Sequence, residues 1–178
     1  MQGRKLFIAV LVVLLAFAAG GCRLGNVNLT ILQTSDVHHH ASGYGPFLDY
    51  TPLDTRDHDQ VLGGYARLAA LINSIRLHQA ARLIPTLVLD SGDFFMGTVY
   101  DLTAADPIAL SFFKALKYDA VTLGNHEFDW SPSGLAMLLS HGVESGFDVP
   151  VVATNMLVPD DNPLQALQAA GVIVDTKV

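Results

Sequence analysis

The sequence predicts an α/β domain with a mostly parallel β-sheet. Three observations support this fold class. Short apolar segments typical of buried strands alternate with longer segments that have the three- and four-residue spacing of amphipathic helices. Polar clusters directly follow the predicted strands. The chain has 178 residues, enough for one compact domain, and alternating strands and helices are typical of parallel sheets with helical crossovers.

The first expected elements begin at residue 27. Residues 27–33 alternate between polar and apolar side chains, which favours a strand. A polar, turn-rich stretch follows over residues 34–64, and a connection this long inside a compact domain is usually functional or mobile. Residues 65–83 are expected to form an amphipathic helix, because apolar side chains recur there at steps of three and four.

The remaining expected elements are shorter. Asp106 and Pro107 are typical of a helix N-cap and first helical position, and Ser131 with Pro132 gives a similar start signal. In order, we expect a strand at 86–89, a helix from Pro107 to about Leu116, a strand at 120–123, a helix from Ser131 to about Leu139, a strand at 149–153, and a short helix with the start of a strand within 163–178.

The N-terminus has the pattern of a secretory signal peptide. Arg4 and Lys5 precede an uncharged apolar run over residues 6–19, which is shorter than the ~20 residues that a membrane-spanning helix needs. Cleavage of this signal peptide would remove Arg4 and Lys5, so the formal net charge would change from −7 to about −9. An acidic domain argues against a nucleic-acid backbone as partner.

Cys22, the single cysteine, excludes an internal disulfide. The sequence Ala19-Gly20-Gly21-Cys22 resembles a bacterial lipobox, which implies lipid attachment at Cys22 and a membrane contact through that lipid. The expected organisation is a signal peptide at 1–21, a tether at 22–27 and the domain at 28–178. The expected location is the cell envelope, on the periplasmic face or the outer membrane. The alternative is an ordinary signal peptide with a leftover cysteine.

The polar clusters after the predicted strands should share one edge of the sheet, because ligands of open α/β sheets bind outside the carboxyl ends of the strands. Carboxylate, imidazole and amide ligands together suit Mn²⁺, Zn²⁺ or Fe²⁺. A pair of such ions can clamp a phosphoryl group. The clusters are Asp36-Val37-His38, Asp90-Ser91-Gly92-Asp93, Gly124-Asn125-His126-Glu127 and Thr154-Asn155.

The ordered motifs resemble those of the calcineurin-like metallophosphoesterases, and in particular the 5′-nucleotidase branch. The matching strings are Asp36-Val-His38, Gly63-Gly64-Tyr-Ala-Arg67, Gly92-Asp93 and Gly124-Asn-His-Glu-Phe-Asp129. The resemblance implies a layered α/β/β/α domain, of which this chain is expected to form the N-terminal part. It also implies that the C-terminal half of the enzyme, with further metal ligands and a nucleoside-binding domain, is missing from the chain.

The resemblance assigns metal ligands residue by residue. Asp36 and His38 would bind a first divalent ion, which could be Mn, Zn or Fe. Asp93 would bridge two ions, and Asn125 would bind the second.

The resemblance also assigns catalytic roles. His126 would stabilise the transition state, and Asp129 would orient its imidazole. Hydroxide generated at the two metals would attack the phosphorus of a small phosphate ester, most simply a nucleotide.

Two other functions stay open. One is a non-catalytic lipoprotein that binds metal or a partner, because the later histidine motifs of the family are absent from the chain. The other is a relative of the sulfur-oxidation thiohydrolases, which share the fold, although the string Asn125-His126-Glu127 favours the phosphatase.

Several polar side chains near the motifs are expected to have no direct role in the chemistry. His39 and His40 are interpreted as solvated loop residues, and Glu127 as an anchor of its loop through hydrogen bonds. For Arg67, a structural or helix-surface charge and a functional charge are equally consistent with the sequence.

Overall fold

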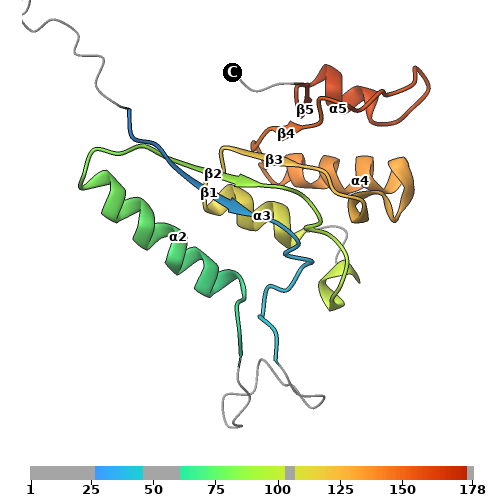
Figure 1. Ribbon diagram of the computed structural model, residues 1–178. Helices are drawn as coiled ribbons and strands as arrows, with labels where there is room; N and C mark the ends of the chain where they lie inside the picture. The colour runs from blue at the N-terminus through green and yellow to red at the C-terminus, as the bar shows by residue number, and fades with distance from the viewer. Residues whose placement is uncertain (1–26, 46–60, 103–106, 176–178) are drawn as a thin grey trace, which may run out of the picture.

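The computed structural model describes residues 27–45, 61–102 and 107–175. Within these ranges the chain forms one five-stranded sheet with helices beside it (Figure 1). The strands lie in sequence order, β1-β2-β3-β4-β5, and each pairs in parallel with the next. The α/β fold with a parallel sheet predicted from the sequence is therefore confirmed.

The observed elements follow the expected order closely. The strands are β1 (Thr30–Thr34), β2 (Thr86–Asp90), β3 (Ala120–Thr122), β4 (Val151–Val152) and β5 (Ile173–Val174). The α-helices are α2 (Tyr65–Ala80), α3 (Ile108–Ala115), α4 (Ser131–Glu144) and α5 (Gln165–Ala169). Two 3₁₀ helices, η1 (Val99–Leu102) and η2 (His126–Phe128), were not predicted, because a single turn is too short to show a hydrophobic period.

Several boundaries differ from those expected: β1 begins at Thr30 and not at residue 27, and β4 spans Val151–Val152 and not residues 149–153. The helix ends differ as well. Helix α2 stops before Leu83, whose φ of 58° lies in the left-handed region. Helix α4 continues to Glu144 instead of ending near Leu139. Its Gly142 lies where an added Cβ would be 2.4 Å from Leu110 of α3, so close packing of the two helices favours the longer helix. Asp106, the expected cap of α3, lies outside the described residues.

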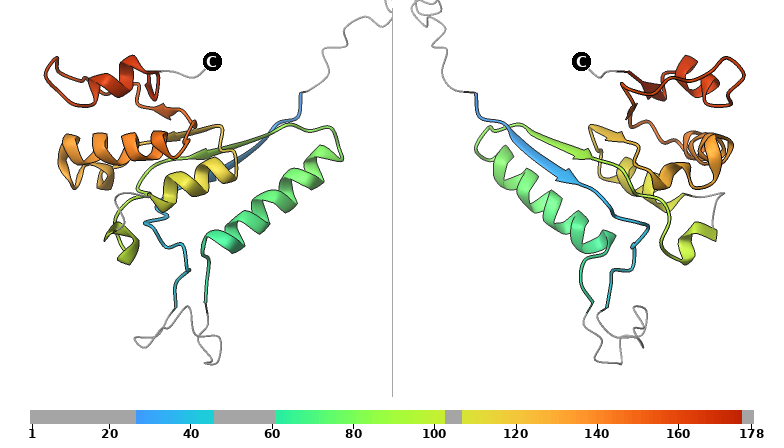
Figure 2. Two further views of the ribbon diagram at one scale, coloured as in Figure 1. Left: turned by 180° about the vertical axis from the view of Figure 1, so that it is seen from behind. Right: turned by 45° about the vertical axis from the view of Figure 1, so that its right-hand side comes forward.

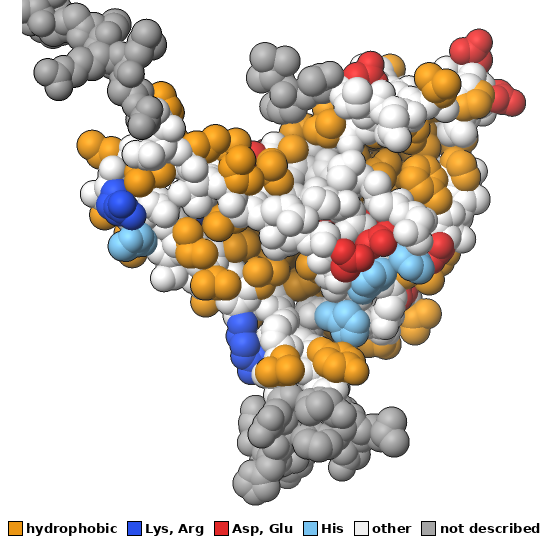
Figure 3. All heavy atoms as spheres, in the orientation of Figure 1, with side chains coloured by type: hydrophobic (Ala, Val, Ile, Leu, Met, Phe, Trp, Pro, Cys, Tyr) orange, Lys and Arg blue, Asp and Glu red, His pale blue; other side chains and the backbone are white. Residues whose placement is uncertain are grey.

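The connecting helices cover one face of the sheet. Every crossover moves to the next strand on the same side, and right-handed crossovers then place their helices on the same face. Figure 2 shows α2, α3 and α4 together on that side of the strands. Val88 and Val121 point towards the helices and are buried. On the opposite face Ile31 is 57% and Leu87 37% exposed, and Figure 3 shows apolar side chains gathered there.

An aromatic cluster joins the core to the loop after β2. Phe94 is fully buried and packs edge-on against Phe113 of α3, with ring centroids 5.2 Å apart. Phe113 also contacts Tyr118 at 4.7 Å. Because Phe94 directly follows Asp93, its burial holds that loop against the core.

In the part of the chain that the structure describes, every helix is too short or too polar to span a lipid bilayer.

Candidate metal centre

The loops after β1 and β2 run side by side at the carboxyl edge of the sheet. The amide of Asp36 donates to the carbonyl of Gly92 (3.0 Å), and the amide of His38 donates to the carbonyl of Asp93 (3.1 Å). These bonds continue the β1–β2 pairing beyond the ends of the strands. Parallel strand pairing therefore brings the first two predicted motifs together.

The loops after β2 and β3 touch through glycine backbones. A Cβ on Gly92 would lie 2.3 Å from the amide nitrogen of Gly124, and the φ of Gly92 is +96°. A Cβ on Gly124 would lie 2.1 Å from Oδ1 of Asp93. Only glycine allows this approach, because any side chain would overlap the neighbouring loop.

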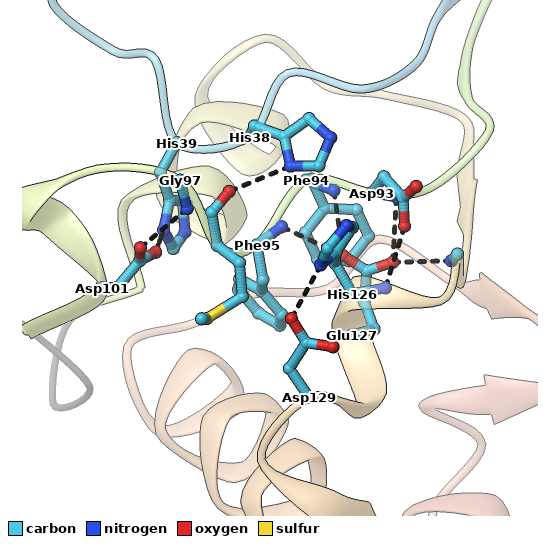
Figure 4. Close-up of polar contacts among 12 residues, drawn as sticks. His38, His39, Asp93, Phe94, Phe95, Gly97, Asp101, His126, Glu127 and Asp129 are labelled. Atoms are coloured by element: carbon cyan, nitrogen blue, oxygen red, sulfur yellow. Dashed lines mark hydrogen bonds and ion pairs between the residues drawn. The ribbon is translucent and has the colours of Figure 1, made fainter.

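Glu127 connects these two loops through a buried carboxylate. Its side chain is 1% exposed. Oε2 accepts the amides of Asp93 (2.9 Å) and Gly124 (2.6 Å), and Oε1 accepts those of Phe94 (2.9 Å) and Phe95 (3.0 Å). Figure 4 shows the carboxylate between the loops. The sequence-based interpretation of Glu127 as a loop anchor agrees with these contacts.

His38, Asp93 and His126 form the centre of the site. Each offers a ligand atom, and these atoms lie within 4.8 Å of one another. The three side chains are half-buried, and Figure 3 shows acidic and histidine side chains gathered on one surface. The rings of His38 and His126 meet edge-on with centroids 5.0 Å apart.

The tautomer of His38 follows from its hydrogen bond. Nδ1 lies 2.9 Å from the carbonyl oxygen of Met96, which can only accept, so Nδ1 carries the proton. Nε2 is then left with its lone pair. Histidines that bind metals in proteins commonly donate their other ring N–H in this way.

His126 is held by a carboxylate on each side. Its Nδ1 lies 2.7 Å from Oδ2 of Asp129, and its amide donates to Oδ1 of Asp93 (3.0 Å). The hydrogen bond to Asp129 raises the pKa of His126 above its ordinary value, and the charges of Asp129 and Asp93 act in the same direction. The imidazole therefore keeps a second proton to higher pH than a free histidine.

Two other expected metal ligands lie at the margin of this centre. Asp36 has an exposed side chain, with Oδ1 3.9 Å from Nε2 of His38. Asn125 is exposed and immediately precedes η2. Their roles as ligands stay predictions. Of the four polar clusters, three meet here, whereas Thr154 donates its hydroxyl to the carbonyl of Asp175 beside β5.

The expectation that His39 is solvated is wrong. The residue is 3% exposed, and its Nδ1 lies 2.5 Å from Oδ1 of Asp101. Burial lowers the pKa of His39, although the hydrogen bond to Asp101 opposes this shift. For Asp101, burial opposes ionisation, but the bonds from His39 and from the amides of Gly97 and Thr98 lower its pKa overall. Sequence reasoning missed Asp101, which belongs to a 3₁₀ helix with no recognisable motif.

The structure also tests the interpretations of His40 and Arg67, which lie near the site. His40 is half-buried, with its ring edge-on to Tyr44 at 5.9 Å, so it is less solvated than expected. Arg67 is exposed and donates to the carbonyl of Gly63 (2.9 Å), which agrees with a structural charge at the start of α2.

The backbone is strained where these loops meet. Asp36, His38, His39 and Asp93 have φ angles of 55°, 39°, 52° and 57°. Such left-handed conformations are uncommon for residues with a Cβ, and they gather at ligand-binding and catalytic sites. Their clustering indicates that the surrounding hydrogen bonds hold these loops in one conformation.

Asp90 is a buried carboxyl beneath the site. It is 3% exposed, accepts the Thr34 hydroxyl at Oδ2 (2.5 Å) and accepts the Gly92 amide at Oδ1 (2.9 Å). Burial raises the pKa of Asp90 to about 6, against the opposing effect of these two hydrogen bonds. The group therefore holds its proton over a range of pH in which an exposed aspartate is ionised.

Comparison with known proteins places these motifs in a family. The family model described as calcineurin-like phosphoesterase matches residues 29–159. The human 5′-nucleotidase is 35% identical over 158 residues, which are 86% of this chain and 24% of that protein. The chain thus spans about a quarter of the length of this relative.

Solved structures show the same likeness. A 5′-nucleotidase precursor from Thermus thermophilus is similar with a TM-score of 0.59 and 33% identity, over 78% of this chain and 24% of the other. A sulfate thiohydrolase from the same organism has a TM-score of 0.54 and 16% identity, over 78% of this chain and 32% of the other. This second likeness shows the shared fold alone.

Replacing Glu127 with glutamine should destabilise the chain by about 3 kcal/mol, because one acceptor oxygen becomes an NH₂ group that faces two amide donors in a buried site. The free energy of unfolding in urea, measured with EDTA present, checks this. The same substitution at the exposed Glu144 is the matched control and should change stability by no more than about 0.5 kcal/mol. Equal effects at the two positions would contradict the anchoring role.

Asp90 should make stability depend on pH. Between the ordinary pKa of 3.8 and about 6, the native state holds the proton and the unfolded state does not, so the free energy of unfolding falls as pH rises. The total loss is about 3 kcal/mol. Asp90→Asn should lack this decline when urea unfolding is measured from about pH 4 to about pH 7 without metal. A difference between variant and unmodified chain that stays constant over this range would rule out the raised pKa.

Proposed function

Because this chain belongs to the calcineurin-like phosphoesterase family, we propose that it is a metal-dependent phosphoester hydrolase of the 5′-nucleotidase type. The observation that carries the proposal is the meeting of His38, Asp93 and His126 at the carboxyl ends of three parallel strands. The proposed substrate is a nucleotide or a similar small phosphate ester, since the human relative is named a 5′-nucleotidase.

The side chains present fit divalent metal ions. Imidazole nitrogen and carboxylate oxygen suit Mn²⁺, Zn²⁺ and Fe²⁺, and the His38 tautomer leaves Nε2 free to bind. We propose that Asp36, His38, Asp93 and Asn125 hold two such ions. Bound divalent ions would polarise a phosphoryl oxygen and lower the pKa of water to near neutral.

His126 is proposed to donate a hydrogen bond to the phosphoryl group. Asp129 accepts from Nδ1 and so directs Nε2 away from itself. The raised pKa of His126 favours a proton at Nε2, and a protonated imidazole has no lone pair left for a metal. A donor in this position would stabilise negative charge on an oxygen as the phosphoester bond breaks.

A second candidate is metal binding without hydrolysis. Of the three residues that cluster in the described part of the chain, only His38 and Asp93 are proposed metal ligands, whereas zinc sites in proteins usually have four ligands. The chain also spans 24% of the human relative.

Hydrolysis of AMP separates the two candidates. We expect Mn²⁺-dependent phosphate release by the chain starting after Cys22, and Asp93→Asn should lower it by about 100-fold or more because an ion ligand is weakened. Asp148→Asn, an exposed aspartate just before β4, is the matched control and should leave the rate unchanged. Mn²⁺ binding without phosphate release would favour the binding protein, and absence of binding would contradict both candidates.

We also propose lipid anchoring at Cys22 in the cell envelope, supported by the lipobox-like sequence alone, because residues 1–26 lie outside the described part of the structure. The mass of the N-terminal peptide from cell membranes should correspond to a lipid-bearing Cys22. Cys22→Ser should remove the lipid and release the protein from the membrane fraction. An unmodified N-terminus that begins elsewhere would favour an ordinary signal peptide.

A further inference from the structure

The hydrogen-bonded pair of His39 and Asp101 lies beside the proposed metal centre, and no step of the proposed function uses it. The pair joins the loop after β1 to the segment at η1, 62 residues further along the chain. The His39 side chain is buried at 4% exposure, and the Asp101 side chain is mostly covered at 14% exposure. Burying His39 beside a carboxylate costs free energy of desolvation, which the contacts of the pair must offset.

The two oxygens of Asp101 have different partners. Oδ1 faces Nδ1 of His39 at 2.5 Å. Oδ2 accepts the amides of Gly97 (2.8 Å) and Thr98 (3.0 Å). The hydroxyl of Thr98 in turn donates to the carbonyl of His39 (3.0 Å). Both the side chain and the backbone carbonyl of His39 are thus hydrogen-bonded to residues of the segment 97–101.

The amide of Gly97 belongs to the same peptide unit as the carbonyl of Met96. That carbonyl accepts a hydrogen bond from Nδ1 of His38, at 2.9 Å. One peptide plane therefore donates to Asp101 on one side and accepts from His38 on the other. Because the peptide unit is rigid and planar, fixing its N–H direction also fixes the direction of its carbonyl.

Close packing supports the same arrangement. Gly97 has a φ of +133°, and a Cβ there would lie 2.9 Å from the carbonyl oxygen of His38. The backbone at residue 97 thus lies directly against the backbone of His38. Figure 4 shows the hydrogen bonds that link His38, His39, Gly97 and Asp101.

We propose that His39 and Asp101 are positioning residues for His38. They orient the Met96–Gly97 peptide so that its carbonyl holds the His38 ring with Nε2 turned towards Asp93 and His126. The inference rests on the proposed function only for the use of Nε2 as a metal ligand. The orientation itself is a property of the metal-free chain, so it can be tested separately from hydrolysis.

The first test needs no variant. A long-range ¹H–¹⁵N correlation spectrum of the imidazole rings, recorded on the chain with EDTA, should show both His38 and His39 with the proton on Nδ1. An Nε2–H form for either ring would overturn the proposal. Failure to hydrolyse AMP would leave this result intact and would bear on the proposed function alone.

Variants then test the dependence of His38 on His39. His39→Leu removes the donor to Asp101, so His38 should change to a mixture of tautomers and Mn²⁺ affinity should fall by about 10-fold or more. His39→Asn keeps an N–H near the position of Nδ1 and should restore both properties. His40→Leu, the next histidine in the run, is the matched control and should change neither.

A purely structural role would give a different pattern. His39→Leu would then lower the thermal midpoint while the His38 tautomer and the Mn²⁺ affinity stayed as in the unmodified chain, and this outcome would overturn the proposal. Equal changes in His40→Leu would overturn it as well. If His39→Leu does not fold, an Nε2–H form of either ring in the unmodified chain would still overturn the proposal.

Discussion

The site depends on one buried carboxylate. Glu127 accepts four backbone amides, three from residues 93–95 after β2 and one from Gly124 after β3. Buried amides without partners are costly, and a charged acceptor with two oxygens satisfies all four at once. Asp93 and His126 therefore sit on loops whose relative position is set by an interaction that involves neither of their side chains.

The sheet supplies the frame for this interaction. Strands in sequence order, all parallel, bring every strand end to one edge, so motifs that lie far apart in the sequence become neighbours. Backbone bonds from Asp36 and His38 extend the pairing of β1 with β2 into the loops, and Gly92 and Gly124 let the next two loops touch. The positive φ angles of these loops persist because so many contacts hold them.

Two carboxylates outside the proposed metal ligands thus brace the centre from different sides. Glu127 holds the loops that carry Asp93 and His126, and Asp101 holds the peptide that orients His38. The residues proposed to touch metal and phosphate thus take their geometry from these supporting groups. The sheet face opposite the helices has exposed apolar residues, including Ile31, so the described part of the chain leaves that face uncovered.

Sequence alone determined the order and type of the regular elements and the identity of the site motifs. The spacing of apolar residues indicates which face of a helix or strand is buried. Polar and turn residues after a strand indicate that the following loop lies at the carboxyl edge of the sheet. Glu127 as a loop anchor could be inferred because it lies within the matching string. Tertiary structure alone decided the burial of His39, its pairing with Asp101 and the extension of α4 through Gly142. These three features depend on contacts between segments that are distant in the sequence. The local pattern of residues cannot predict them, because it does not specify which distant atoms will pack beside a side chain.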